Sequence, residues 1–352
     1  MLRSRLSHRH VQTTDSDANH PYPMHSRGEH AMSLTPAQLE QFRRDGYIIV
    51  PDLFSDAEMH AALAAMDQTF YGKPFDAWLA DCDAGQAEAA SDGFTTSHDH
   101  ETGRSQFPTG ADALDNLIEN EAYLDIFEQC LHDQASYCNA HLFLRSGPTD
   151  KRHSEHPWQG YHIDHNTNCL LPPFGEVGRF DYVNSGVYLH DVEDDGAPIM
   201  MIPGSHKLAH EAYLRALAAG NASGGSITDL REATELAKPV PAVGKRGSAV
   251  FYSSYLIHAA QPFADKRVQR AFWTLSMCRR DNDRWTRFAN PFIYGEREHM
   301  LPFFTRTTPR VRSLFGFPKP GHPYYTEGTI KLLADFIPGI DLKPYRQALA
   351  TS

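Results

Sequence analysis

The feature that most constrains the fold is a change in hydrophobic period at Ser136. Beyond it, short apolar stretches alternate with a period of two and are separated by turn residues, which favours an antiparallel sandwich or barrel over alternating strands and helices. The pattern predicts strands at residues 137–144, 160–164, 182–189, 199–202, 249–252 and 270–278. Residues 207–237, helical at 210–219 and then rich in Gly and Ser, are expected to form a loop over the open end of the barrel.

Helices are expected before and after these strands in the sequence. Thr35 with Gln38, and Ser55 with Glu58, have the spacing of capping boxes and begin two helices. The remaining expectations are a helix end at Gly46, a strand at 47–50, a loop with helix fragments at 84–115, a helix at 117–131, an aromatic run at 315–325 and a helix at 327–336. The predicted fold class is therefore mainly β with flanking helices.

Three regions follow from composition. Residues 1–32 contain five histidines and few apolar side chains, so they cannot bury enough surface to order themselves and are expected to be a disordered tail, with Met32 as a candidate start. Residues 33–300 are expected to be the β domain. Residues 301–352 are expected to be an aromatic and helical extension packed on the barrel.

The charge and the cysteine content limit the classes of binding partner and the cellular compartment that we expect. With 33 Lys and Arg against 44 Asp and Glu, the net charge of −11 argues against nucleic acid and anionic lipid. No apolar run is long enough to span a membrane. Five separated cysteines without a CxxC pair favour a reducing, cytoplasmic compartment. The expected partner is a small-molecule substrate, and the oligomeric state stays open.

The pair His162 and Asp164 is the first candidate for chemistry. On an extended strand, residues i and i+2 project from the same face, so an imidazole and a carboxylate there can chelate one metal ion. A similar cluster at His98, Asp99 and His100 lies in a polar stretch with no strand to hold it, and is expected to be a solvated surface cluster.

His258 is the candidate third ligand, because a glycine turn at Gly247 begins an apolar strand that delivers this histidine at its far end. Two histidines and one carboxylate form the facial triad that holds Fe(II) and leaves positions open. The equal alternative is a buried histidine that donates to a backbone carbonyl. On the next strand, Arg270, Phe272, Thr274 and Ser276 are predicted to share one face, so Arg270 suits a carboxylate ligand better than Arg267, which lies in an expected turn.

Taken in order, these motifs resemble the phytanoyl-CoA dioxygenase (PhyH-like) family of Fe(II)/2-oxoglutarate oxygenases. The residues that carry the resemblance are the opening at 34–51, His162 with Asp164, the run 189–198, the turn 202–207, and His258 with Arg270. It implies a double-stranded β-helix (a cupin-like jelly roll), iron held by His162, Asp164 and His258 as catalytic ligands, and the C5 carboxylate of 2-oxoglutarate held by Arg270.

Two positions depart from the family pattern. Ala260 stands where members often have a serine that hydrogen-bonds the cosubstrate, and Arg270 follows His258 by twelve residues rather than eleven, which suggests a one-residue insertion at 264–266. His206 is a rival third ligand on spacing alone, but in the resemblance it is a structural turn residue.

The expected activity is hydroxylation of a small organic molecule with O2 as cosubstrate and release of succinate and CO2. The resemblance also implies that the carboxylate of Asp164 favours hydroxylation or desaturation over halogenation. The alternatives are a jelly-roll metal-binding or scaffold protein and a zinc hydrolase that uses the same ligands. His165, Asn166 and Asn168 are candidates to line the pocket, and Tyr188 is a candidate to face inward; for each of them a supporting or loop position is an equal alternative. The acidic total gives no support for a CoA ester.

Overall fold

The computed structural model describes residues 33–86, 103–148, 161–164, 180–208, 236–265, 267–281 and 297–351. The tail predicted at residues 1–32 and the helix predicted at 210–219 lie outside the described residues. So do the histidine cluster at 98–100 and the pocket candidates His165, Asn166 and Asn168.

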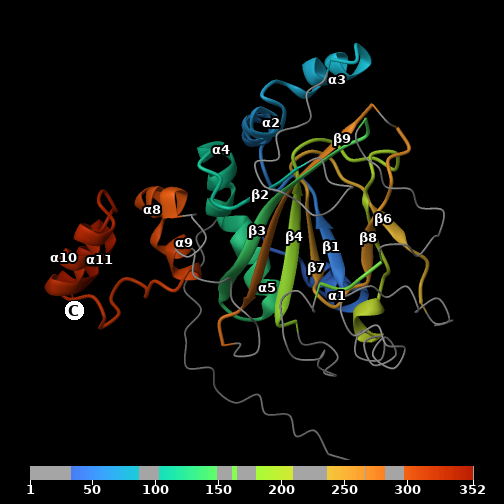
Figure 1. Ribbon diagram of the computed structural model, residues 1–352. Helices are drawn as coiled ribbons and strands as arrows, with labels where there is room; N and C mark the ends of the chain where they lie inside the picture. The colour runs from blue at the N-terminus through green and yellow to red at the C-terminus, as the bar shows by residue number, and fades with distance from the viewer. Residues whose placement is uncertain are drawn as a thin grey trace, which may run out of the picture. The chain divides into compact units, whose positions relative to one another are not determined.

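Two antiparallel sheets form the centre of the described chain (Figure 1). The first has six strands in the order β1-β7-β4-β9-β3-β2, and the second has three in the order β6-β5-β8. Their bounds are β1 Tyr47–Val50, β2 Gly103–Gln106, β3 Ala135–Ser146, β4 Tyr182–Tyr188, β5 Ile199–Met201, β6 Val240–Ala242, β7 Ala249–Ser253, β8 His258–Ala260 and β9 Gln269–Arg279. Neighbours in the six-stranded sheet are distant in sequence, as in a jelly roll, and the predicted fold class is confirmed.

Two strand predictions need correction. The stretch 84–115 contains β2, which was expected to be loop, because its sequence has no apolar alternation and its pairing is set by the edge of β3. Of the strand predicted at 160–164, the described residues 161–164 form only an isolated bridge between His162 and His258. β6 and β8, of three residues each, were not separately predicted.

The predicted capping boxes are present in both N-terminal helices. In α1 (Pro36–Asp45) the Thr35 side chain accepts from the backbone of Gln38, and in α2 (Asp56–Tyr71) Ser55 does the same for Glu58. Gly46 ends α1 with φ of 82°, a left-handed conformation that costs glycine little. Further helices before the main strands are α3 Phe75–Asp83, α4 Asp112–Asp115, the 3-10 turn η1 Asn116–Glu119 and α5 Glu121–Leu131.

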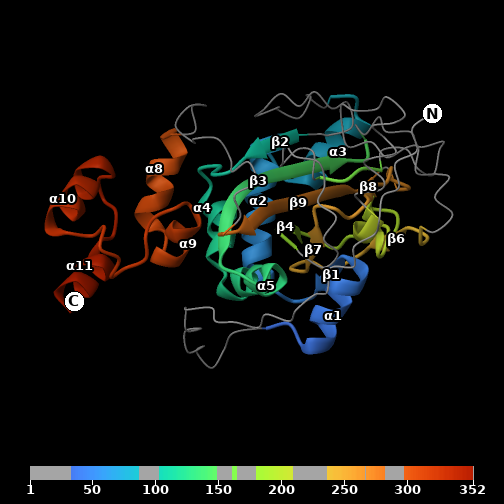
Figure 2. The same cartoon turned by 90° about the horizontal axis from the view of Figure 1, so that it is seen from below.

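The large hydrophobic core lies between the outer face of the six-stranded sheet and the helices. Helix α5 contacts β3, β4 and β9, and both views place it along these strands (Figures 1 and 2). Tyr123 of α5 lies against Phe251 of β7 and Trp273 of β9, with ring centroids 5.4 and 5.8 Å apart. This packing fixes which face of each strand points away from the helices.

The opposite, inner face carries polar and aromatic side chains. In β4, Val183 and Val187 belong to the helix-side core, so Tyr182, Asn184, Gly186 and Tyr188 point inward. A Cβ atom at Gly186 would come within 1.6 Å of the Phe272 ring, so glycine is required for this ring to lie across β4. The inner face is therefore where sequence and packing place candidate site residues.

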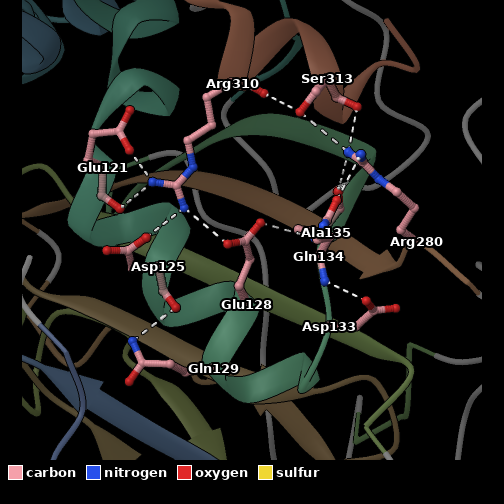
Figure 3. Close-up of polar contacts among 10 residues, drawn as sticks. All are labelled: Glu121, Asp125, Glu128, Gln129, Asp133, Gln134, Ala135, Arg280, Arg310 and Ser313. Atoms are coloured by element: carbon pink, nitrogen blue, oxygen red, sulfur yellow. Dashed lines mark hydrogen bonds and ion pairs between the residues drawn. The ribbon is translucent and has the colours of Figure 1, made fainter. Parts of the chain in front are cut away.

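The C-terminal helices are α8 Arg297–Arg306, α9 Pro309–Leu314, α10 Glu327–Phe336 and α11 Lys343–Ala350. Helix α10 has the predicted bounds, and α8 crosses residue 300, where the sequence placed the start of the extension. Phe315 stacks on Tyr137 of β3 at 4.4 Å between ring centroids. Arg310 of α9 pairs with acidic side chains of α5 (Figure 3).

Among the described helices, none combines the length and the hydropathy needed to cross a bilayer.

Candidate active site

Three predicted side chains converge between the two sheets. The ligand atoms of His162, Asp164 and His258 all lie within 4.8 Å of one another. The backbones of the two histidines bridge each other, with each N–H donating to the other carbonyl at 3.0 Å. Among the described residues, this is the only group of three or more His, Cys, Asp or Glu side chains placed to hold a metal ion.

His258 reaches this point by a change of sheet, which corrects the expectation of one continuous strand after Gly247. β7 ends at Ser253 in the six-stranded sheet, the next four residues turn, and β8 begins at His258 in the three-stranded sheet. The turn is held by Leu256 N–H donating to the Ser253 carbonyl and by Ile257 N–H donating to the Ser205 hydroxyl. The histidine therefore lies at the junction of the two sheets.

Asp164 is held from several sides. Its backbone N–H donates to the Ser254 carbonyl at 3.0 Å, and its Oδ2 accepts from Asn184 Nδ2 at 2.7 Å. Oδ1 lies 3.4 Å from Nε2 of His162, and Oδ2 lies 3.5 Å from Nε2 of His258. Burial works to raise the pKa of Asp164, but the neighbouring imidazoles and the Tyr252 hydroxyl outweigh it, and the pKa falls to about 2. The carboxylate is therefore ionised at neutral pH.

His258 is the buried histidine bonded to a backbone carbonyl that the sequence offered as one interpretation, and its other ring nitrogen stays available for the second, a metal ligand. Its Nδ1 lies 2.9 Å from the Leu256 carbonyl, which can only accept, so Nδ1 carries the proton. The ring thereby keeps the lone pair of Nε2 directed toward Asp164. Burial lowers the pKa of His258, which keeps the ring neutral, the form that binds metals.

The donor set fits a divalent transition metal. Two imidazoles and one ionised carboxylate match the mixed nitrogen and oxygen preference of Fe(II), and the described part of the chain places no thiolate in this group. The side chain of His162 is 40% exposed, whereas that of His258 is 7% exposed, so the group lies between buried and solvent-accessible surroundings among the described residues. Three protein ligands leave coordination positions for other molecules, as in catalytic metal centres.

Arg270 lies on the inner face of β9. It is 5% exposed, its Nη1 donates to the Ala197 carbonyl at 2.8 Å, and its guanidinium lies 5.7 Å from the centroid of the Phe272 ring. Its cross-strand partner on β3 is Arg145, which is 1% exposed, so two buried arginines are direct neighbours in the sheet. Arg267, the alternative, is exposed and pairs with Asp83. The twelve-residue spacing therefore still puts Arg270 inside.

His206 lies in a turn outside the group of candidate ligands, whereas Tyr188 points inward, as the sequence suggested. His206 packs against Phe180 and against the backbone of Gly46, and its Nε2 contacts the Arg43 carbonyl at 3.1 Å, so it is a structural residue of the turn. The Tyr188 hydroxyl donates to the Ala242 carbonyl on β6, which joins the two sheets.

Sequence reasoning missed Asn184 as a contact of Asp164. Its signal was the period of two in β4, which places residue 184 on the inner face. Ser276, correctly predicted to share a face with Arg270, donates to Asn184.

Comparison with protein-family models gives a match. The family model described as phytanoyl-CoA dioxygenase (PhyH) matches residues 42–270, more than half of the chain. A search of curated proteins returned no match.

Solved structures similar to this chain include apo EctD from S. alaskensis, at 20% identity and a TM-score of 0.43, covering 70% of this chain and 77% of that one. The non-heme alpha ketoglutarate dependent carbocyclase SnoK from nogalamycin biosynthesis has 14% identity and a TM-score of 0.47, covering 72% and 87%. HygX from Streptomyces hygroscopicus, with nickel and 2-oxoglutarate bound, has 14% identity and a TM-score of 0.43, covering 72% and 90%.

The family match spans the candidate ligands His162, Asp164 and His258 and ends at Arg270. The chain therefore belongs to the phytanoyl-CoA dioxygenase (PhyH) family, whose cofactors are Fe(II), 2-oxoglutarate and O2.

Proposed function

We propose that this protein hydroxylates a small organic molecule in a reaction that depends on Fe(II), 2-oxoglutarate and O2. The observation that carries the proposal is the convergence of His162, Asp164 and His258, on a chain that also buries Arg270 on the inner face. One oxygen atom of O2 enters the substrate as hydroxyl, and the other enters succinate as 2-oxoglutarate loses CO2.

Each residue has a defined role in this proposal. His162, Asp164 and His258 would hold the iron, and bound iron with 2-oxoglutarate would supply the oxidising chemistry. Arg270 would fix the distal carboxylate of the cosubstrate through its planar fork. Tyr161, Ile163 and Ile257 are buried in one hydrophobic cluster, which anchors the backbone on either side of His162 and before His258.

The test measures succinate release and O2 dependence. With Fe(II) and 2-oxoglutarate under argon, the protein should show a visible charge-transfer band, and succinate should form only when O2 and a substrate are added. His162→Ala should abolish both signals, because one of the three ligands is lost. His60→Ala is the matched control, because His60 is an exposed histidine on α2 and should leave both signals unchanged.

Other results would favour the rival functions. Turnover that continues in argon would support a zinc hydrolase, and metal binding without a charge-transfer band would support a scaffold. Succinate release retained in His162→Ala would remove the oxygenase proposal.

We also propose a reducing, cytoplasmic compartment. The described cysteines, Cys82, Cys130, Cys138 and Cys278, are all free thiols, and burial raises the pKa of the Cys130 thiol, which makes it unreactive.

A further inference from the structure

A row of hydroxyl and amide side chains crosses the inner face of the six-stranded sheet. The register pairs Tyr47 of β1 with Tyr252 of β7, Tyr252 with Asn184 of β4, Asn184 with Ser276 of β9, and Ser276 with Asn139 of β3. Directly paired residues point to the same face of a sheet, so these five side chains form one line, here called the polar row. Asn184, at its centre, contacts Asp164.

Two short hydrogen bonds connect the polar row to the carboxylate. The Ser276 hydroxyl donates to Asn184 Oδ1 at 2.6 Å, and Asn184 Nδ2 donates to Asp164 Oδ2 at 2.7 Å. Asn184 and Ser276 are 4% and 6% exposed, so water does not compete strongly for these groups. Because the hydroxyl donates to the amide oxygen, the amide group must present its N–H end to Asp164. Ser276 therefore sets the orientation in which Asn184 can act.

The backbone hydrogen bonds of β4 do not require an amide side chain at residue 184. Asn184 is paired through its main chain with β7 on one side and β9 on the other, so the ladder hydrogen bonds of β4 are independent of the side chain. The neighbouring residue in β4, Ser185, is also buried, and its hydroxyl contacts Tyr123 on the helix side.

We propose that Asn184, oriented by Ser276, is a positioning residue that holds the carboxylate of Asp164 in the orientation that faces both histidines. Asn184 Nδ2 donates to Oδ2, the oxygen that lies 3.5 Å from Nε2 of His258, while Oδ1 lies 3.4 Å from Nε2 of His162. A carboxylate without this hydrogen bond can rotate away from that orientation, which weakens its contribution to a metal site. The inference rests on the proposed function, because it assumes a metal held by the three ligands.

The test is a Co(II) titration of the metal-free protein under argon, without 2-oxoglutarate, followed by the visible spectrum of the bound ion. Asn184→Leu removes the donor and should weaken Co(II) binding about 10- to 100-fold, the usual cost of losing an outer hydrogen bond to a ligand. The absorption bands should also change, because the carboxylate of Asp164 is then no longer held in one orientation toward the ion. Circular dichroism checks the fold, and Asn184→Ser, a smaller change, carries the same expectation if Asn184→Leu does not fold.

Substitutions at Ser276 separate positioning from packing. Ser276→Ala leaves the amide in place without its anchor, so a several-fold weakening is expected, and Ser276→Thr, which keeps the hydroxyl, should restore the affinity. Ser185→Ala is the matched control, because it removes an equally buried hydroxyl on the opposite face of the sheet and should leave Co(II) binding unchanged.

The outcomes distinguish the two proposals. If the unsubstituted protein binds no Co(II), the metal centre and the proposed function both fail. If it binds Co(II) and the folded Asn184 variant binds within twofold with the same spectrum, the positioning role is wrong while the proposed function stands. Equal losses in Ser276→Ala and Ser185→Ala would also overturn the role, because they would indicate a general effect of cavities in the sheet.

Discussion

His190 is a partly buried histidine outside the candidate metal centre, and its contacts hold it neutral. Its Nε2 accepts from the Ala271 N–H at 2.9 Å, so Nδ1 carries the proton and donates to the Asp191 carbonyl at 2.7 Å. Burial is the main cause that lowers the pKa of His190, from 6.5 to about 4. The ring links the end of β4 to β9 only in its uncharged form, because a second ring proton would face the Ala271 N–H.

This depressed pKa predicts a loss of stability in mild acid. Since the unfolded chain binds the proton more readily than the folded protein, the stabilisation is complete above pH 6.5 and is lost as the pH falls toward 4, by about 3 kcal/mol at most. His190→Gln keeps an acceptor for the Ala271 N–H but cannot titrate. Urea unfolding at pH 4 to 7.5 should show a shallower dependence in the variant, and parallel curves would contradict the prediction.

Gly186 is a second position that affects the inner face, because the absence of a side chain there makes room for the Phe272 ring. Gly186→Ala would force the Phe272 ring to move, since the nearest ring atom lies 1.6 Å from the new Cβ. We expect a loss of about 1 to 3 kcal/mol in the free energy of unfolding and weaker binding of 2-oxoglutarate, because Phe272 lies beside Arg270.

The control for this prediction is Gly328→Ala in α10, where the nearest atom to a new Cβ is 3.7 Å away. It should be neutral or slightly stabilising, because alanine favours the helix. Equal stability of Gly186→Ala and the unsubstituted protein would show that the sheet accommodates the methyl group.

At the scale of elements, salt bridges of Arg310 connect α9 to α5 (Figure 3). Arg310 Nη2 lies 2.6 Å from Asp125 Oδ1 and 3.2 Å from Glu128 Oε2, and Nη1 pairs with Glu121. Burial opposes the charge, but these carboxylates outweigh it and raise the pKa of Arg310. Arg280 of the β9 end donates to the Ser313 carbonyl at 2.7 Å, which adds a second connection to α9.

Arg310→Met should destabilise the protein by about 1 to 3 kcal/mol, because it keeps the apolar stem and leaves three acidic side chains of α5 without their shared cation. Urea unfolding measures the loss, which should be smaller at high salt. Arg267→Met, which removes an exposed pair with Asp83, should leave the midpoint unchanged. Equal midpoints for the two variants would show that the contact contributes no stability.

Features set by local sequence were the predictable ones. The capping boxes at Thr35 and Ser55 and the bounds of α10 depend on a few adjacent residues, and the structure has them as expected. The sheet change after Ser253 could not be predicted, because an apolar run gives the same pattern whether it continues or turns. The same-face placement of His162 and Asp164 needs only extended backbone, so it did not depend on a strand. Asn184 required the register, which sequence alone does not supply.

At the scale of the whole described chain, the core and the candidate site lie on opposite faces of one sheet. The helix-side cluster includes residues of α1, α2, α5, α8 and α11. Smaller clusters on the inner face surround the site, with Tyr161 and Ile257 in one and Tyr252 and Leu256 in another. Most of the buried hydrophobic side chains therefore lie between the sheet and the helices, whereas the inner face carries the polar side chains of the candidate site.

The junction position of His258 would let a bound metal ion connect the two sheets. His258 belongs to β8 in the three-stranded sheet, while Asp164 is hydrogen-bonded by Asn184 from the six-stranded sheet. Because such a site exists only when the sheets are assembled, Co(II) at one hundred times its dissociation constant should add about 2.7 kcal/mol to the free energy of unfolding. Calorimetry with and without the ion measures this gain, and its absence would mean that the ion does not prefer the folded protein to the unfolded chain.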